Sequence, residues 1–93
     1  MIKAYELMVV VKPDAGVNDE KKAREVIENL MGDRATITSV TFLGKKQLAY
    51  PIQKLHEGTY ILAKIEGVKM NVHEIEKKAQ MGDSVLRFLL TNN

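Results

Sequence analysis

Side chains suited to acid–base, nucleophilic or metal chemistry are sparse in this 93-residue sequence. The histidines, His56 and His73, stand apart, and neither has a second histidine or an acid pair at ligand spacing. Cysteine is absent, which excludes thiol nucleophiles and cysteine-based metal sites. Ser39 and Ser84 lie in no nucleophile elbow, and no Walker or Rossmann glycine pattern occurs. We therefore expect a protein that binds other molecules and is not an enzyme, with no cofactor, no metal and no small-molecule substrate.

Positive charge is concentrated in one part of the chain. The net charge is +2, and the acid-free segment from position 34 to position 56 carries all of this surplus. Its bases are Arg34, Lys45, Lys46 and Lys54. A local excess of cations attracts anions, so this segment is a candidate phosphate-binding surface. A hairpin kept soluble by its lysines would have the same composition, and charge alone leaves both interpretations open.

Length and composition limit the class of protein. A chain of 93 residues fits one domain, which we expect to span residues 1–93. Apolar residues at 45% and charged residues at 28% are typical of a folded soluble domain. No segment approaches the roughly 18 consecutive apolar residues of a membrane span, and the start has no secretion-signal pattern. We expect a cytoplasmic protein that contacts no membrane.

Hydrophobic periodicity predicts an alternation of strands and helices. The expected elements are strands over 5–11, 36–50, 59–66 and 84–90 and helices over 18–32 and 71–82. Gly44 indicates a bulge or a close backbone approach within the long strand, and Pro51 should stop its pairing before a polar loop over 53–58. The order β-α-β-β-α-β predicts an α+β fold of the ferredoxin-like type, a four-stranded antiparallel sheet with both helices on one face.

Strand parity predicts which side chains enter the core and which lie on the open face of the sheet. The expected core positions are Tyr5, Leu7, Val9, Val11, Ile61, Ala63 and Ile65. The opposite parity gives a half-apolar set, Met8, Val10, Tyr60 and Leu62. A continuous exposed patch of these four would indicate a face for a protein partner. Loops or side-chain stems covering the face are the alternative.

Two groups of proteins with this topology bind phosphate or RNA by recognisable residues. Acylphosphatases cradle phosphate with an arginine in the loop after the first strand, but loop 12–18 here lacks arginine and contains Asp14. RNA-recognition motifs stack bases on aromatic side chains of the central strands, and here the third strand offers only Tyr60. If RNA is bound, we expect phosphate and shape contacts to dominate.

Four segments together resemble the family of the bacterial small-subunit ribosomal protein number six. These segments are 5–14, 44–54, 57–60 and 82–87. The run Leu-Ala-Tyr-Pro-Ile at 48–52, after a glycine and basic residues, is the most specific part. The resemblance implies a non-catalytic constituent of the small ribosomal subunit. It also implies binding to the central domain of small-subunit ribosomal RNA together with small-subunit ribosomal protein eighteen.

The resemblance also implies which residues face RNA. They are Lys3, Lys46, Tyr50, Lys54 and Arg87, and Lys45 is added because of its charge. Lysines would act as point charges, whereas Arg87 could contact two phosphate oxygens or instead form a salt bridge with Glu6. The family often has two arginines before Leu-Ala-Tyr, so Lys45 and Lys46 remove that bidentate option. A self-associating ferredoxin-like regulatory module is the alternative function.

Overall fold

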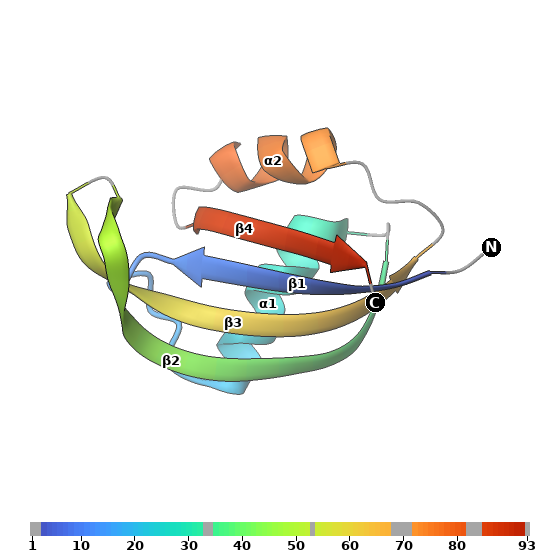
Figure 1. Ribbon diagram of the computed structural model, residues 1–93. Helices are drawn as coiled ribbons and strands as arrows, with labels where there is room; N and C mark the ends of the chain where they lie inside the picture. The colour runs from blue at the N-terminus through green and yellow to red at the C-terminus, as the bar shows by residue number, and fades with distance from the viewer. Residues whose placement is uncertain (1–2, 33–34, 53, 68–71, 82–84, 93) are drawn as a thin grey trace.

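Two helices and a four-stranded antiparallel sheet make up the part of the chain that the structure, a computed structural model, describes: residues 3–32, 35–52, 54–67, 72–81 and 85–92. The order is β1 (Lys3–Val11), α1 (Glu20–Met31), β2 (Thr36–Ile52), β3 (Leu55–Gly67), α2 (Val72–Met81) and β4 (Val85–Asn92) (Figure 1). The strands lie in the order β2-β3-β1-β4. The predicted ferredoxin-like fold is confirmed.

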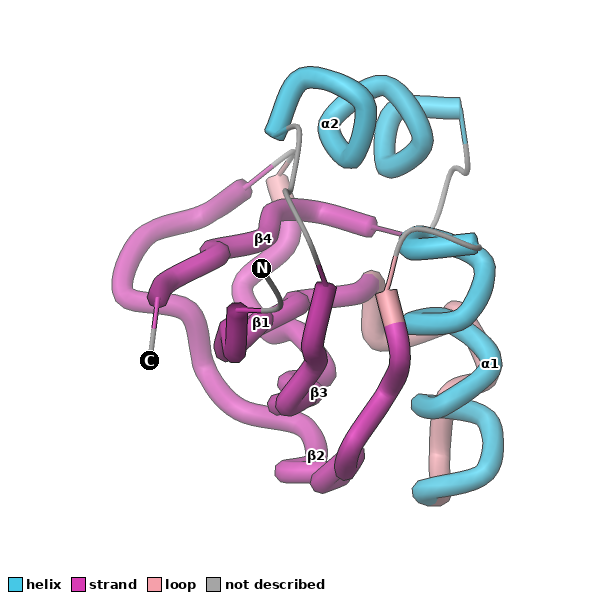
Figure 2. Tube along the Cα trace, turned by 90° about the vertical axis from the view of Figure 1, so that its right-hand side faces the viewer, coloured by secondary structure: helices cyan, strands magenta, loops and turns pink. Residues whose placement is uncertain are grey.

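The main core lies between the sheet and the helices (Figure 2). All the core positions expected from strand parity are buried, among them Leu7 and Ile61, because alternate side chains of a strand share a face. The helices add Ala23, Ile27, Leu30 and Met31 from α1 and Ile75 and Ala79 from α2. Within the described ranges, neither helix has the length and apolar character needed to cross a membrane.

The helix ends follow their capping residues. The N-cap of α1 is Asp19, whose carboxylate accepts a 2.8 Å hydrogen bond from the backbone N–H of Lys22. Gly32 caps the C-terminus with a φ of 58°, as predicted. In α2, Ile75 and Ala79 are buried but Val72 is 49% exposed, so the apolar face of this helix does not include its first residue. The expected boundary residues Asn71, Gly82 and Ser84 lie outside the described residues.

The β2–β3 hairpin extends further than the sequence indicated. β3 begins at Leu55, so the expected loop over 53–58 is wrong. Pro51 lies within β2, but regular pairing stops as predicted: Gln47 pairs with Glu57, and the next pair is Ile52 with Leu55. Four residues of β2 thus lie opposite one residue of β3, and this stretch tolerates a proline because it needs no ladder N–H.

We expect truncation of Leu7 to lower the free energy of unfolding far more than truncation of Leu89. Leu7 is fully buried in β1, whereas Leu89 of β4 is 63% exposed. Leu7→Ala should therefore cost about 2 to 5 kcal/mol, and Leu89→Ala about 0.5 kcal/mol or less. Urea denaturation of the two variants measures both values. Equal losses would contradict the packing of β1 described here.

Candidate nucleic-acid interface

The outer part of the hairpin carries most of the candidate RNA-facing residues. We call residues 45–52 and 54–58 the hairpin arm. It projects past the ends of β1 and β4 and curves beside the start of β4 (Figure 1). Its cations Lys45, Lys46 and Lys54 are all exposed. Arg34, the other base of the acid-free segment, lies outside the described residues.

Lys45 and Lys46 lie on opposite faces of the arm. Lys45 is paired with Thr59 and lines a small cleft of about 390 Å³ together with Asp14. Lys46 is paired with Gly58, whose position faces Val10 on the open side of the sheet. Successive strand residues point to opposite faces, so the two ammonium groups cannot contact the same phosphate surface from one side. The arm therefore presents positive charge on both of its faces.

Lys54 stands immediately before β3 in an unusual backbone conformation. Its φ is 66°, the one positive φ recorded for a non-glycine residue in the described part of the chain. The left-handed region disfavours residues with a Cβ by roughly 1 to 2 kcal/mol. The side chain is exposed, so the turn places a cation at the outer end of the arm.

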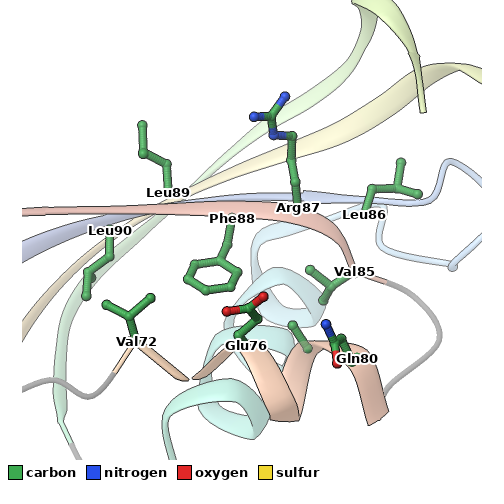
Figure 3. Close-up of a pocket in the computed structure, with 10 residues that line it drawn as sticks. Val72, Glu76, Gln80, Val85, Leu86, Arg87, Phe88, Leu89 and Leu90 are labelled. Carbon is green, nitrogen blue, oxygen red and sulfur yellow. The ribbon is translucent and has the colours of Figure 1, made fainter. Parts of the chain in front are cut away.

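Tyr50 of the arm contacts Arg87 of β4, although 37 positions separate them in the sequence. The Nη1 of Arg87 donates a 2.6 Å hydrogen bond to the Tyr50 hydroxyl, and the guanidinium carbon lies 5.9 Å from the ring centroid. Arg87 points away from α2, whereas Phe88 points toward it (Figure 3). The contact therefore joins the arm to the open face of the sheet.

The alternative partner predicted for Arg87 is wrong. In the β1–β4 ladder Arg87 is opposite Val10, and Glu6 is opposite Thr91. The offset of four residues separates Glu6 from Arg87 by roughly 13 Å along the strand. Tyr50, and not Glu6, is therefore the neighbour of the guanidinium.

The open face is less exposed than parity suggested. Val10 is only 4% exposed, although it lies outside the main core cluster. A Cβ built on Gly58 would lie 2.5 Å from Val10 Cγ1 and 3.4 Å from Leu48 Cδ2, so the arm packs closely over Val10. The expected continuous exposed patch is therefore wrong at Val10.

The other members of that expected patch keep part of their surface. Met8, Tyr60 and Leu62 are half-buried. Leu89, which parity reasoning did not single out, is 63% exposed and pairs with Met8. Met8 also pairs with Leu62, so Leu89, Met8 and Leu62 form an apolar row across three strands.

Lys3 lies apart from the other candidates. It is exposed at the start of β1, opposite Gly67 of β3. Seven residues of strand, roughly 23 Å, separate it from Val10, the residue opposite Arg87. The structure thus brings Tyr50 and Arg87 together beside the lysines of the arm and leaves Lys3 at the opposite end of the sheet.

A larger cleft of about 680 Å³ lies between α2 and β4 (Figure 3). Its wall is mostly apolar, with Val85, Phe88 and Leu90 facing the helix, and its polar groups include Glu76 and Gln80. No group of three or more potential metal ligands occurs among the residues that the structure describes.

Comparison with known proteins identifies the family. Residues 4–92 match the family model described as ribosomal protein S6. The chain belongs to the ribosomal protein S6 family. This result confirms the resemblance found in the sequence. It also confirms the prediction of a non-enzyme, because the family is a structural one.

Individual relatives agree with this assignment. Small ribosomal subunit protein bS6 of Synechocystis sp. is 36% identical over 92 residues, covering 96% of this chain and 80% of that protein. The protein of the same name from Caldanaerobacter subterraneus subsp. tengcongensis is 37% identical over 90 residues, covering 96% and 95%. The crystal structure of 30S ribosomal protein S6 from Thermotoga maritima has a TM-score of 0.81 at 21% identity, covering 100% and 89%, and supports the fold.

Replacing Gly44 should destabilise the hairpin through its backbone conformation alone. Gly44 has a φ of 90° at a register shift of β2, and a Cβ there would meet no atom within 4 Å. Of the two predicted reasons for this glycine, the bulge is therefore confirmed and the close approach is wrong. We expect Gly44→Ala to lower the free energy of unfolding by about 1 to 2 kcal/mol. Lys45→Ala, at the next position, should change it by about 0.5 kcal/mol or less in the same denaturant titration.

Proposed function

We propose that this chain is a structural constituent of the small ribosomal subunit that binds the central domain of small-subunit ribosomal RNA together with small-subunit ribosomal protein eighteen. The observation that carries the proposal is a projecting hairpin arm with three exposed lysines and one acid, Glu57, among its described residues, in a chain of the ribosomal protein S6 family. Its place of action would be the ribosome, in the cytoplasm.

The arm would contact RNA through phosphate groups. Lys45 and Lys46 lie on opposite faces of the arm, and Lys54 lies at its outer end. A projecting ribbon with cations on both faces can contact phosphates of two RNA segments at once, which suits folded RNA better than a single exposed strand. Lysine supplies point charges without bidentate geometry, so recognition would follow the shape of the RNA backbone.

Tyr50, Arg87 and Lys3 would complete the RNA-facing set. Tyr50 is 57% exposed, so its ring is available to a base or sugar beside the arm. Arg87 is exposed and donates one N–H to the Tyr50 hydroxyl, so its part in this set would be chiefly to hold Tyr50 in place. Lys3 would reach a separate RNA segment, because it lies at the opposite end of β1.

The open face would bind the protein partner. The proposed contact consists of Met8, Leu62 and Tyr60, extended by the exposed Leu89. Val10 would support this face from beneath the arm without touching a partner, since it is already covered. With an apolar row beside a basic arm, the protein contact would lie next to the RNA contact, which suits joint recognition of the two partners.

Neutralising either lysine of the arm should weaken RNA binding and flatten its salt dependence. When one phosphate contact is lost, binding releases fewer counterions. The magnitude of the slope of log K against log salt should therefore fall by about 0.7 to 0.9 for Lys45→Ala and for Lys46→Ala. Lys21→Ala, on the exposed face of α1, is the matched control and should leave the slope unchanged. Unchanged slopes in both arm variants would remove the arm from the RNA interface.

The proposal as a whole is tested by binding to a fragment of the small-subunit central-domain RNA. We would measure affinity with and without small-subunit protein eighteen at two salt concentrations. Tight, salt-sensitive binding that requires the partner is the expected result. If the protein binds the RNA under none of these conditions, the proposed function is refuted.

The alternative of a self-associating module has one supporting observation. β4 is an edge strand of the sheet and carries the exposed Leu89. Light scattering of the isolated protein at micromolar concentration discriminates between the two functions. A stable dimer that is lost in Leu89→Lys would favour self-association, whereas a monomer would leave the apolar row for a different partner.

A further inference from the structure

The hairpin arm is attached to the rest of the molecule at two places outside the β-ladder. The first is the close approach of the Val10 side chain to Gly58, a position that also lies near the Leu48 side chain. Gly58 is buried, and its φ lies outside the left-handed range, so the backbone itself would accept alanine there. Only the 2.5 Å approach of Val10 Cγ1 to a built Cβ excludes a side chain. Gly58 is therefore a glycine because the arm lies against the sheet.

The second attachment is the hydrogen bond from Arg87 to Tyr50. At 2.6 Å it is a short bond from a charged donor, a class stronger than neutral hydrogen bonds. The guanidinium also lies within the roughly 6 Å limit of a cation–π contact with the Tyr50 ring. Both partners are exposed, so the bond joins the surface of the arm to the surface of β4.

The arm needs such attachments because its own ladder is incomplete. Between Gln47 and Ile52 the strand β2 has no regular partners on β3. A two-stranded hairpin alone is marginally stable in water even with a full ladder. The residues within this gap include Tyr50, which contacts Arg87 of β4, and Leu48, whose side chain lies close to Gly58. The stretch that lacks ladder bonds therefore supplies Tyr50, the arm residue of the second attachment.

We propose that Val10, Leu48, Tyr50, Gly58 and Arg87 form a clasp that fixes the arm on the open face before RNA arrives, and that Arg87 acts chiefly as a positioning residue. The inference rests on the proposed function, because the arm carries the lysines that would contact phosphate. A surface ordered in advance binds with a smaller loss of conformational entropy, so the clasp raises affinity without adding a phosphate contact.

The clasp itself is tested on the free protein by amide hydrogen exchange. Tyr50→Phe removes only the hydroxyl that accepts the bond, and Arg87→Ala removes the donor. Each should accelerate exchange in the arm by about threefold to tenfold, the range for the loss of one hydrogen bond. Lys64→Ala is the matched control, because Lys64 is an exposed cation of β3 outside the arm. Unchanged exchange in both clasp variants would overturn the clasp whatever the protein does with RNA.

The positioning role is tested by RNA affinity measured over a range of salt concentrations, with protein eighteen present. Tyr50→Phe and Arg87→Ala should each lower affinity by about threefold to tenfold while the salt slope stays as in the wild type. The double variant should bind like Arg87→Ala alone, because both changes break the same bond. A slope lowered by about 0.7 to 0.9 in Arg87→Ala would show a direct phosphate contact and overturn the positioning role.

Gly58 provides an independent test that changes no charge. Gly58→Ala should displace the arm, accelerate its exchange and weaken RNA binding without altering the salt slope. Val10→Ala in the same chain removes the Cγ1 that the new methyl would meet, so the double variant should recover part of both losses. Absence of recovery in a folded double variant would overturn the packing half of the clasp. If Gly58→Ala does not fold, the two surface variants still decide the proposal.

The failure of this inference is distinguishable from the failure of the proposed function. A wild-type protein that does not bind the RNA refutes the function and with it the positioning role, whatever the exchange data show. If the wild-type protein binds the RNA and the Tyr50→Phe and Arg87→Ala variants bind it with the same affinity as the wild type, the positioning role alone is refuted.

Discussion

The unequal lengths of paired strands determine most of what is distinctive in this structure. β2 has 17 residues and β3 has 13, whereas their neighbour β1 has 9. A ladder extends only as far as its shorter strand, so the outer parts of β2 and β3 must leave the sheet as a two-stranded arm. The register shifts lengthen β2 further relative to β3, and bulged strands bend. The covered Val10 and the Tyr50–Arg87 contact both follow from this excess of chain.

One face of the sheet contributes to the stability of the fold, and the other is available for binding. On one face, side chains such as Leu7 and Ile61 are sealed against the helices and supply the burial on which folding depends. On the other face, an apolar row and exposed cations contribute little to stability, because exposed charges interact weakly through water. Surface residues of this kind can be selected for binding with little loss of fold stability.

Much of the fold could be predicted from the sequence because it depends on local patterns. Period-two alternation identified Leu7 and the alternate residues Tyr5 and Val9 as core, and Gly32 marked the end of α1. The arm could not be predicted in the same way. Polar residues around position 56 were interpreted as a loop, since strand propensity does not register a ladder that continues into solvent. Tyr50 and Arg87 were both singled out as RNA-facing, yet nothing local shows that residues 37 positions apart will meet.

The close packing over Val10 has a consequence for solubility. Leu7, Met8, Val9, Val10 and Val11 form an uncharged apolar run that ends in three β-branched residues, the kind of segment that associates with copies of itself when exposed. Helices cover one face of such a run in any ferredoxin-like fold, and here the arm covers Val10 on the other. The contacts between the arm and Val10 thus also reduce the apolar surface that the open face of the sheet presents to other copies of the chain. A chain whose arm is displaced would expose Val10, and it would lose the burial of that side chain together with part of its resistance to association.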